Sequence, residues 1–482
     1  MRFAAMKPKS AIVVGAGFAG LSAALELGRA GVQVTVLEAL SSAGGRAQRR
    51  TENGYTFDLG PTLIVMTDVL KRTLGDESFA RLALSRIEPG YEIRWPDGQR
   101  FALHSDIALL VAEFARFEGP MRASHALRYL ADVHEAFTDA QSRILERDHT
   151  VASFLRTIVT PGRMRPWIFG NLRAFTQRYF THPRTVEALT FQSLYLGTSP
   201  LRAPALYALL PVSEAVGGVW YAPGGTGAIV AACVDACKQL GVRFVFNARV
   251  DRIDATNKGV SIFADDERYD ADAVVVTADR EPAMRQLFGA QAPPRERRMR
   301  YGHSAAVWYV GVRRAIDLPH HTVFLPQNPW QAYAALDAGR QLDDPMVYVC
   351  NPRVSDATVA PAGHSALLVL TPVPNRSHGP TLDTHALRER VLQRLEREVG
   401  PLRDAIAVER FRGPKEFAEE LGLLHGAAFG PDHTLDQMTA FRPSIAHPHY
   451  RNVVFAGSGT RPGSGVPMVL ISGRLAAQRL LQ

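Results

Sequence analysis

The stretch S-A-I-V-V-G-A-G-F-A-G-L-S-A-A-L, from Ser10 to Leu25, decides the fold of this chain. The apolar run 11–14 is typical of a buried parallel strand, and residues 18–30 show helical periodicity. After Gly31, a second apolar strand over 32–37 ends at Glu38. This order of strand, glycine turn, helix, strand and acid predicts a Rossmann-like β-α-β unit.

The glycines and the acid of this unit predict a dinucleotide site. Gly15 permits a tight turn, Gly17 lets backbone N–H groups approach a pyrophosphate, and Gly20 lets helix and strand pack closely. The helix N-terminus favours phosphate, and the Glu38 carboxylate accepts hydrogen bonds from ribose hydroxyls. A lone G-x-G-x-x-G also occurs in purely structural turns, but here every part of the unit stands in the required order.

The residues that follow select the dinucleotide. Gly44-Gly45-Arg46 comes six residues after Glu38, and F-D-L-G-P-T occupies 57–62. This continuation resembles the flavin-binding N-terminus of the amine-oxidase and phytoene-desaturase superfamily. The resemblance implies FAD rather than a nicotinamide cofactor, with the glycine pair and the arginine along the pyrophosphate.

Composition indicates an ordinary globular protein with a basic surface. The 482 residues are 46% hydrophobic and 21% charged, with a net charge of +8. No nucleic-acid motif accompanies the charge, so we expect no nucleic-acid partner. The other interpretations are a basic solvated surface or attraction to anionic lipid.

Arginines and aromatic residues alternate in the predicted helical region 105–214. They are Arg163, Arg165, Arg173, Arg178 and Arg184 with Trp167, Phe169, Phe175, Tyr179 and Phe180. The pattern fits either an amphipathic helical surface or a segment that lies in a membrane interface. A further basic cluster over 295–300 could extend such a patch.

The cysteines and the N-terminus predict the compartment. Cys233, Cys237 and Cys350 show neither C-x-x-C nor metal-ligand spacing, so we expect no metal and a reducing cytoplasm. The basic start before Ser10 lacks the apolar length of a signal peptide, and no run of eighteen apolar residues occurs. We expect a cytoplasmic protein that associates peripherally with membranes.

Four blocks along the chain together resemble the bacterial and fungal-type phytoene desaturases, a carotenoid desaturase family. They are the N-terminal block with E-x5-G-G-R and F-D-L-G-P-T, G-V-W-Y-A-P-G-G-T-G-A-I, H-G-A-A-F-G with F-R-P-S, and N-V-V-F-A-G-S-G-T-R-P-G-S-G-V-P. The resemblance extends over almost the whole chain. The first block is shared by amine-oxidase-like flavoproteins in general, whereas the last is narrower.

The resemblance implies an α/β fold with two interleaved domains. A Rossmann-like FAD-binding domain would comprise 1–95, 215–290 and 430–482. A substrate domain of mixed sheet and helices, facing the membrane, would comprise 96–214 and 291–429.

The family chemistry is FAD-dependent desaturation of a long polyene, such as phytoene or a downstream acyclic or hydroxylated carotenoid (3,4-desaturation). A hydride passes to the flavin and a proton leaves the neighbouring carbon, and dioxygen or a quinone reoxidises the cofactor. The lipophilic substrate requires access from a membrane surface. The rivals are a carotenoid ketolase or isomerase, an amine or protoporphyrinogen-type FAD oxidase, and a non-catalytic membrane-surface flavoprotein.

The family's cofactor contacts carry over to matching positions of this chain. The expected contacts of the adenosine diphosphate part are Gly15, Ala16, Gly17, Gly20, Glu38, Gly45, Arg46 and, through its backbone, Val250. The expected contacts towards the pyrophosphate, ribityl chain and isoalloxazine are Pro61, Thr62, Gly457, Ser458, Gly459, Val466, Pro467 and Met468.

The catalytic proton acceptor is left open. Relatives often carry an acid shortly before the L-T-F-Q-S-L segment, where this chain has His182. His182 could accept a proton near neutral pH, or it could be a surface histidine that begins a helix. Water could also collect the proton.

Overall fold

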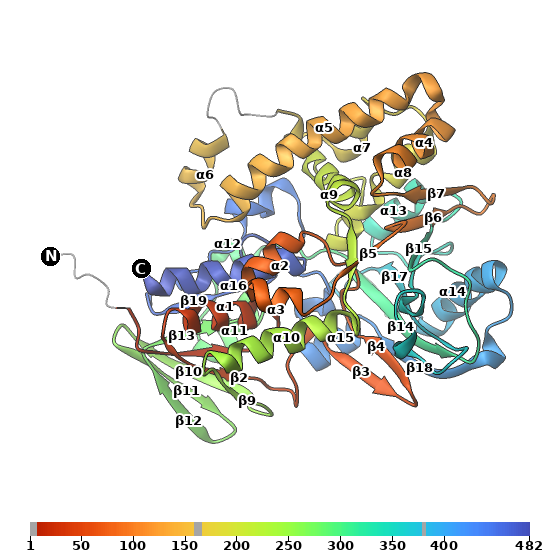
Figure 1. The fold of residues 1–482 in the computed structure, drawn as a ribbon. Helices are drawn as coiled ribbons and strands as arrows, with labels where there is room; N and C mark the ends of the chain where they lie inside the picture. Colours follow the sequence, from red (N-terminus) through yellow and green to blue (C-terminus); the bar gives the residue numbers. More distant parts are fainter. Residues whose placement is uncertain (1–6, 159–165, 378–381) are drawn as a thin grey trace.

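A computed structural model describes residues 7–158, 166–377 and 382–482. Its central element is a five-stranded parallel sheet in the order β19-β13-β1-β2-β9 (Figure 1). The strands are β1 (Ser10–Val14), β2 (Gln33–Leu37), β9 (Arg243–Val245), β13 (Ala273–Val276) and β19 (Val453–Phe455).

Both faces of this sheet are covered, as the uninterrupted apolar strands require. Ala11 and Val13 of β1 pack with helices α1, α10 and α16, whereas Ile12 and Val14 pack towards a three-stranded sheet and α11. The covering elements are α1 (Phe18–Arg29), α10 (Gly225–Gln239), α11 (Arg280–Phe288), α16 (Val466–Leu481), β10 (Val250–Thr256), β11 (Gly259–Ala264) and β12 (Glu267–Ala271).

A seven-stranded sheet forms the second layer, in the order β18-β14-β17-β16-β15-β6-β7. All neighbours are antiparallel except β15 and β6, which run parallel. The strands are β6 (Tyr91–Arg94), β7 (Arg100–Leu103), β14 (Ser304–Val312), β15 (His321–Phe324), β16 (Val347–Cys350), β17 (Ser365–Val373) and β18 (Ile406–Arg412).

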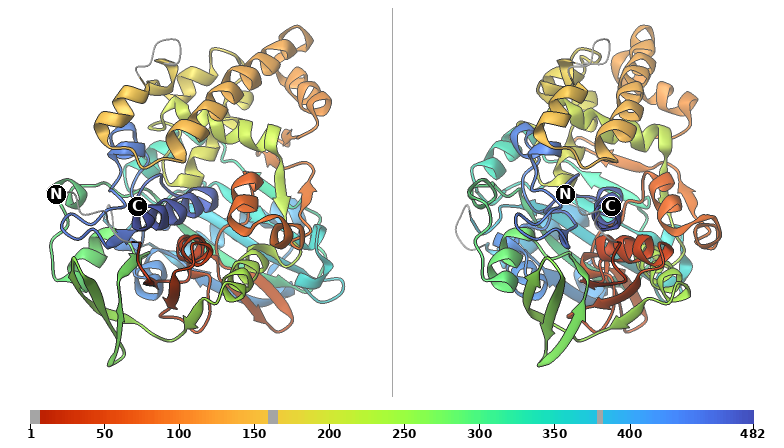
Figure 2. Two further views of the ribbon diagram at one scale, coloured as in Figure 1. Left: turned by 60° about the vertical axis from the view of Figure 1, so that its left-hand side comes forward. Right: turned by 90° about the vertical axis from the view of Figure 1, so that its left-hand side faces the viewer.

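Helices cover the two faces of this second sheet. Helix α14 (Thr384–Val399) packs on one face, and a helical lobe packs towards the other. Figure 2 shows that the lobe and the three-stranded sheet lie at opposite ends of the molecule. The lobe consists of α4 (Ile107–Glu118), α5 (Ala123–Ala140), α6 (Val151–Ile158), α7 (Leu172–Thr176), α8 (Pro183–Ala188) and α9 (Leu209–Gly217).

Shorter elements connect these layers. Two antiparallel β-ribbons accompany the two sheets: β3 pairs with β4, and β5 pairs with β8 (Figure 1). The remaining elements used below are β3 (Arg49–Glu52), β4 (Tyr55–Asp58), β5 (Ser85–Ile87), β8 (Val219–Tyr221), α2 (Thr67–Leu74), α3 (Asp76–Ala80), α12 (Pro294–Arg297), α13 (Pro329–Asp337) and α15 (Pro414–Leu421).

The architecture confirms the predicted α/β fold with a Rossmann-like part. The predicted boundary at residue 95 falls inside the hairpin β6–β7, so strand β6 belongs to the second sheet and not to the parallel one. The reason is that β6 pairs with β15, more than two hundred residues away, and no local pattern reveals that pairing. The domain limits otherwise remain a prediction.

Candidate functional site

The glycine turn after β1 has an open side at Gly17. A Cβ at Gly20 would lie 1.9 Å from the Gly15 carbonyl oxygen, so the close approach of α1 to the strand requires glycine there. At Gly17, by contrast, the nearest atom to such a Cβ is the Gly44 carbonyl oxygen, at 3.9 Å. The backbone therefore leaves room for a phosphate group at the start of α1.

Glu38 is buried at the end of β2 and organises this turn. Its Oε2 accepts a hydrogen bond from the Ala16 N–H at 2.7 Å, and its Oε1 accepts one from the Leu40 N–H at 2.9 Å. A carboxylate offers about four acceptor sites, so about two remain for the ribose hydroxyls that the sequence predicts.

Arg46 links the two ends of the chain. Its guanidinium donates to Ser458 Oγ at 2.7 Å and to Asp279 Oδ1 at 3.1 Å. Gly45, one residue earlier, approaches Gly17 so closely that its Cβ would lie 3.4 Å from the Gly17 Cα. The predicted pyrophosphate residues of the first and last blocks are thus brought together at one edge of the parallel sheet.

Asp279 is a candidate cofactor residue that the sequence analysis missed. It follows β13, its side chain is 6% exposed, and its Oδ2 has no hydrogen-bond partner among the described residues. A buried acceptor without a partner beside Arg46 is a fitting site for a cofactor hydroxyl. The signal in the sequence was the acid at the end of a third parallel strand, at the edge where ligands bind.

The remaining adenosine and flavin-end residues flank this edge. The Ala248 N–H donates to the Glu38 carbonyl oxygen at 2.9 Å, which places the segment before Val250 beside the end of β2. Thr62 lies towards the second sheet, where its Oγ1 contacts the Tyr348 hydroxyl at 2.6 Å. Pro61 precedes it in the same segment.

The C-terminal glycine turn leads into α16, which begins at Val466. Val466, Pro467 and Met468 therefore form its first turn, and the backbone N–H groups of Val466 and Met468 favour a negative charge in front of the helix. Gly457 and Gly459 lie at the other end of the turn, on either side of Ser458.

Two buried residues that the sequence analysis left without a role hold this turn. Arg442, 1% exposed, donates to the Ser458 carbonyl oxygen at 2.7 Å and to the Pro431 carbonyl oxygen at 3.1 Å. The Ser464 N–H donates to His433 Nε2 at 3.2 Å. Burial lowers the pKa of Arg442 to about 10 and that of His433 well below its usual value, so the imidazole is a neutral acceptor.

His182 is the N-cap of α8. Its Nδ1 accepts from the Arg184 N–H at 3.2 Å, its own N–H donates to Glu118 at 2.9 Å, and its ring packs against Phe117. None of these contacts involves a residue predicted to hold FAD. These contacts match the alternative in which His182 is a histidine that begins a helix. They give no support to a role of His182 as proton acceptor, which stays a prediction.

A glutamate on α9 has an unusual environment. Glu214 is 4% exposed, and burial raises the pKa of its carboxyl to about 8, an effect that a hydrogen bond with Tyr91 opposes. Glu214 was not predicted from the sequence, because it lies more than twenty residues after Gln192 of the L-T-F-Q-S-L segment. Only the fold brings the two residues together around Tyr91.

Three buried side chains near Thr62 have metal-ligating chemistry. His320, His321 and Cys350 each offer a donor atom, and these atoms lie within 4.8 Å of one another. His321 Nδ1 contacts the same Tyr348 hydroxyl that contacts Thr62, at 2.8 Å. Burial lowers the pKa of His320 to about 4 and that of His321 well below its usual value, so both imidazoles are neutral groups near Thr62, a residue predicted at the flavin end.

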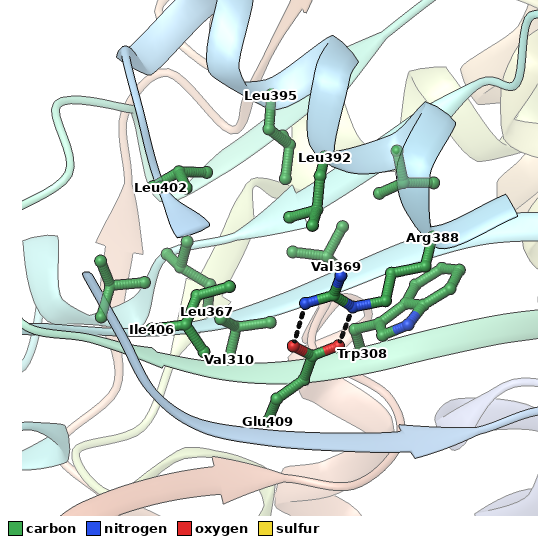
Figure 3. A pocket seen from close by; sticks show the side chains of 12 residues that line it. Trp308, Val310, Leu367, Val369, Arg388, Leu392, Leu395, Leu402, Ile406 and Glu409 are labelled. Carbon is green, nitrogen blue, oxygen red and sulfur yellow. Dashed lines mark hydrogen bonds and ion pairs between the residues drawn. The ribbon is translucent and has the colours of Figure 1, made fainter. Parts of the chain in front are cut away.

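Two small cavities lie on the second sheet. One, of about 20 Å³, is lined by Asp58, Thr62, His320 and Cys350, among others, and so includes a residue predicted at the flavin end. The other, of about 10 Å³, lies between α14 and the opposite face of the sheet beside the Arg388–Glu409 pair, whose two hydrogen bonds measure 2.5 and 2.6 Å (Figure 3). It is no larger than the space of one water molecule and belongs to the packing of α14.

The alternation of arginines and aromatic residues resolves mostly into core packing. Phe175 and Phe180 are 3% and 0% exposed, and Trp167 stacks on Phe175 with ring centroids 4.2 Å apart. Arg173 lies over the Trp330 ring, and Arg184 pairs with acids. Arg163 and Arg165 lie outside the described residues, and in the cluster over 295–300 the Arg300 guanidinium pairs with Asp436.

Other side chains give the helical lobe an apolar surface. Among the described residues, the exposed large apolar side chains of the lobe are Ile107, Leu109, Met121, Leu127, Leu155, Phe169 and Val216. In the part of the chain that the structure describes, no helix is both long and apolar enough to span a membrane.

Comparison with known proteins places this geometry in a family. The sequence model of the protein family described as flavin containing amine oxidoreductase matches residues 18–481 of this chain. Solved structures with the same fold include a putrescine oxidase variant (TM-score 0.65, 16% identity, 98% of this chain and 99% of that one). An oxidoreductase from Methanosarcina mazei is equally similar (TM-score 0.65, 15% identity, 96% and 98%). The chain belongs to the flavin-containing amine oxidoreductase family, and the predicted cofactor, FAD, is confirmed.

Curated relatives narrow the class. The chain is 34% identical to a zeta-carotene-forming phytoene desaturase of Myxococcus xanthus, over 98% of this chain and 93% of that protein. It is 33% identical to a carotenoid 3,4-desaturase of Haloarcula japonica, over 98% and 97%. The predicted membership of the phytoene desaturase branch is therefore confirmed, and the protein is an oxidoreductase.

Proposed function

We propose that this chain is an FAD-dependent carotenoid desaturase acting on CH–CH bonds of a long polyene. The observation that carries the proposal is the end-to-end similarity to the Myxococcus and Haloarcula desaturases, which spans 98% of the chain in each case. When bound, FAD supplies the hydride acceptor. Dioxygen or a quinone is the proposed final electron acceptor.

The chain's own residues would position the cofactor. The open backbone at Gly17 and the Arg46 guanidinium suit the pyrophosphate, and Glu38 and Asp279 have acceptor capacity left for hydroxyl groups. The first turn of α16 suits the end of the isoalloxazine that becomes negative, because unpaired N–H groups stabilise charge there.

The rival functions predict different products. A ketolase adds oxygen, an isomerase changes only geometry, and an amine or protoporphyrinogen-type oxidase leaves polyenes unchanged. Incubating the holoenzyme with phytoene, lycopene and a hydroxylated carotenoid in liposomes, followed by chromatography, separates these outcomes. Loss of two hydrogens per step supports a desaturase, and any other product with all three substrates contradicts it. Anaerobic bleaching of the flavin by a polyene distinguishes an enzyme from a non-catalytic flavoprotein.

We also propose that the protein works peripherally at the cytoplasmic surface of a membrane. A lipophilic substrate must be taken from lipid, and the exposed apolar side chains of α4 (Leu109), α5 (Leu127) and the turn between them (Met121) offer a surface that can enter the headgroup region. The net charge of +8 favours anionic lipid.

A further inference from the structure

Glu214 is surrounded by polar groups from three other elements. They are Tyr91 on β6, Gln192 and Tyr195 on the 3-10 segment Phe191–Leu196, and Tyr348 on β16. Tyr91 makes a hydrogen bond with Glu214, and Gln192 Nε2 donates to the same Tyr91 hydroxyl. The carboxyl thus lies at the meeting point of α9, the second sheet and the segment Phe191–Leu196.

The polar atoms of this group are not all paired. Glu214 Oε2, Gln192 Oε1 and the Tyr195 hydroxyl are buried and have no hydrogen-bond partner among the described residues. Each such atom is costly in a folded protein. These three atoms leave the group with hydrogen-bonding capacity that no described residue uses.

The group borders the flavin end of the cofactor site. Tyr348, which is close enough for the Glu214 charge to affect its pKa, contacts Thr62 at 2.6 Å. Helix α9 also runs directly into β8, where Trp220 bridges to Ile64, two residues after Thr62. Tyr348 thus connects the group around Glu214 with Thr62, a residue predicted at the flavin end.

The electrostatic surroundings suit a proton acceptor. Burial raises the pKa of the Glu214 carboxyl to about 8, and the Tyr91 hydrogen bond works in the opposite direction. Burial, and then the Glu214 charge, raise the pKa of Tyr91 and of Tyr195. No arginine, lysine or histidine of the described residues shifts the Glu214 pKa. A carboxyl with a pKa near neutral pH is a stronger base than an ordinary carboxyl and is still partly in the carboxylate form that accepts a proton.

We propose that the Glu214 carboxylate is the proton acceptor of the desaturation, taking the proton at Oε2; the inference rests on the proposed function. When bound, FAD would accept one hydrogen of the polyene as a hydride, with both electrons of its C–H bond. A hydrogen on the neighbouring carbon leaves as a proton to Oε2, which converts the carboxylate into the acid. The electron pair of that second C–H bond becomes the second bond of the new C=C.

The test compares the wild-type holoenzyme with Glu214→Gln, Glu214→Asp and Tyr91→Phe, and with Glu419→Gln as a control at an exposed glutamate of α15. Glu214→Gln should lower the desaturation rate at least about 100-fold, and Glu214→Asp should restore part of it. In the wild type the rate should rise with pH up to about 8. Tyr91→Phe removes the hydrogen bond that lowers the Glu214 pKa, so its rate profile should move to higher pH.

A second measurement does not depend on the steady-state rate. In an anaerobic single turnover at about one pH unit above the Glu214 pKa, infrared difference spectra should show a protonated carboxyl appear in the wild type and not in Glu214→Gln. If Glu214→Gln fails to fold, the Tyr91→Phe profile and the wild-type spectrum still decide.

Rates within about threefold of wild type for Glu214→Gln, an unshifted Tyr91→Phe profile, or no new carboxyl band would each overturn the proposal. If the wild type desaturates none of the three polyenes, the proposed function itself is wrong. A desaturating wild type with an active Glu214→Gln leaves the function intact and refutes only the role of Glu214.

Discussion

Glu38→Gln is the sharpest perturbation of the cofactor site, because both carboxylate oxygens already accept buried backbone N–H groups. A glutamine keeps one acceptor oxygen and turns an NH₂ group towards either the Ala16 N–H or the Leu40 N–H. One buried donor is then left without an acceptor, which should lower the unfolding free energy of the apoprotein by about 1–3 kcal/mol.

The same change should weaken FAD binding. A hydrogen bond from a ribose hydroxyl to a charged acceptor contributes about 1.5–3 kcal/mol, so its loss should raise the Kd roughly 10- to 150-fold. Denaturant unfolding of the apoprotein measures the first effect, and quenching of flavin fluorescence during reconstitution measures the second. Glu419→Gln, at an exposed position of α15, is the control and should change neither.

The two readouts separate two roles of Glu38. A stability loss without a change in Kd would show that Glu38 only organises the turn and does not contact the cofactor. If the apoprotein is as stable as wild type and the Kd rises less than about threefold, the hydrogen bonds to Ala16 and Leu40 do not have the importance argued from the 2.7 and 2.9 Å distances.

Four further outcomes are expected. Burial raises the pKa of the Glu214 carboxyl to about 8 in the folded protein, against an ordinary value of 4.5, so between these pH values the folded state holds a proton that the unfolded state has lost. The unfolding free energy should therefore fall by up to about 5 kcal/mol as the pH rises from 4.5 to 8. Urea titrations of the wild type and of Glu214→Gln should show this pH dependence in the wild type and not in the variant. Arg442→Met leaves buried carbonyl oxygens unpaired and should cost at least about 2 kcal/mol, with faster FAD loss on dialysis; unchanged stability would contradict its structural role. Met121→Glu and added salt should each weaken co-sedimentation of the protein with anionic vesicles. Val354→Glu, at an exposed residue outside the lobe, is the control and should not weaken it. If the two variants weaken binding equally, the lobe is not the membrane-binding surface. NADPH should not be required for turnover, and a strict requirement would refute the proposed electron path.

Sequence patterns predicted the parallel part of the fold well because its signals are local. The turn at Gly15–Gly20, the strand ending at Glu38 and the late strand before Gly457 each carry their own glycine and apolar pattern within about twenty residues. The second sheet was harder. Its strand β6 pairs in parallel with β15, and nothing in either short segment specifies a partner so distant in the chain.

The predicted cofactor residues come from strand ends and glycine turns, each of which has its own local pattern in the sequence. The sequence by itself determined a dinucleotide-binding α/β protein, a flavin and a family. Only the tertiary structure decided which side chains meet: Arg46 with Ser458 and Asp279, Arg442 with the carbonyl of the last glycine turn, and Glu214 with Tyr91. The physical reason is that the burial and electrostatics of a carboxyl depend on groups from several distant elements, which become neighbours only when the sheets and the helical lobe pack together.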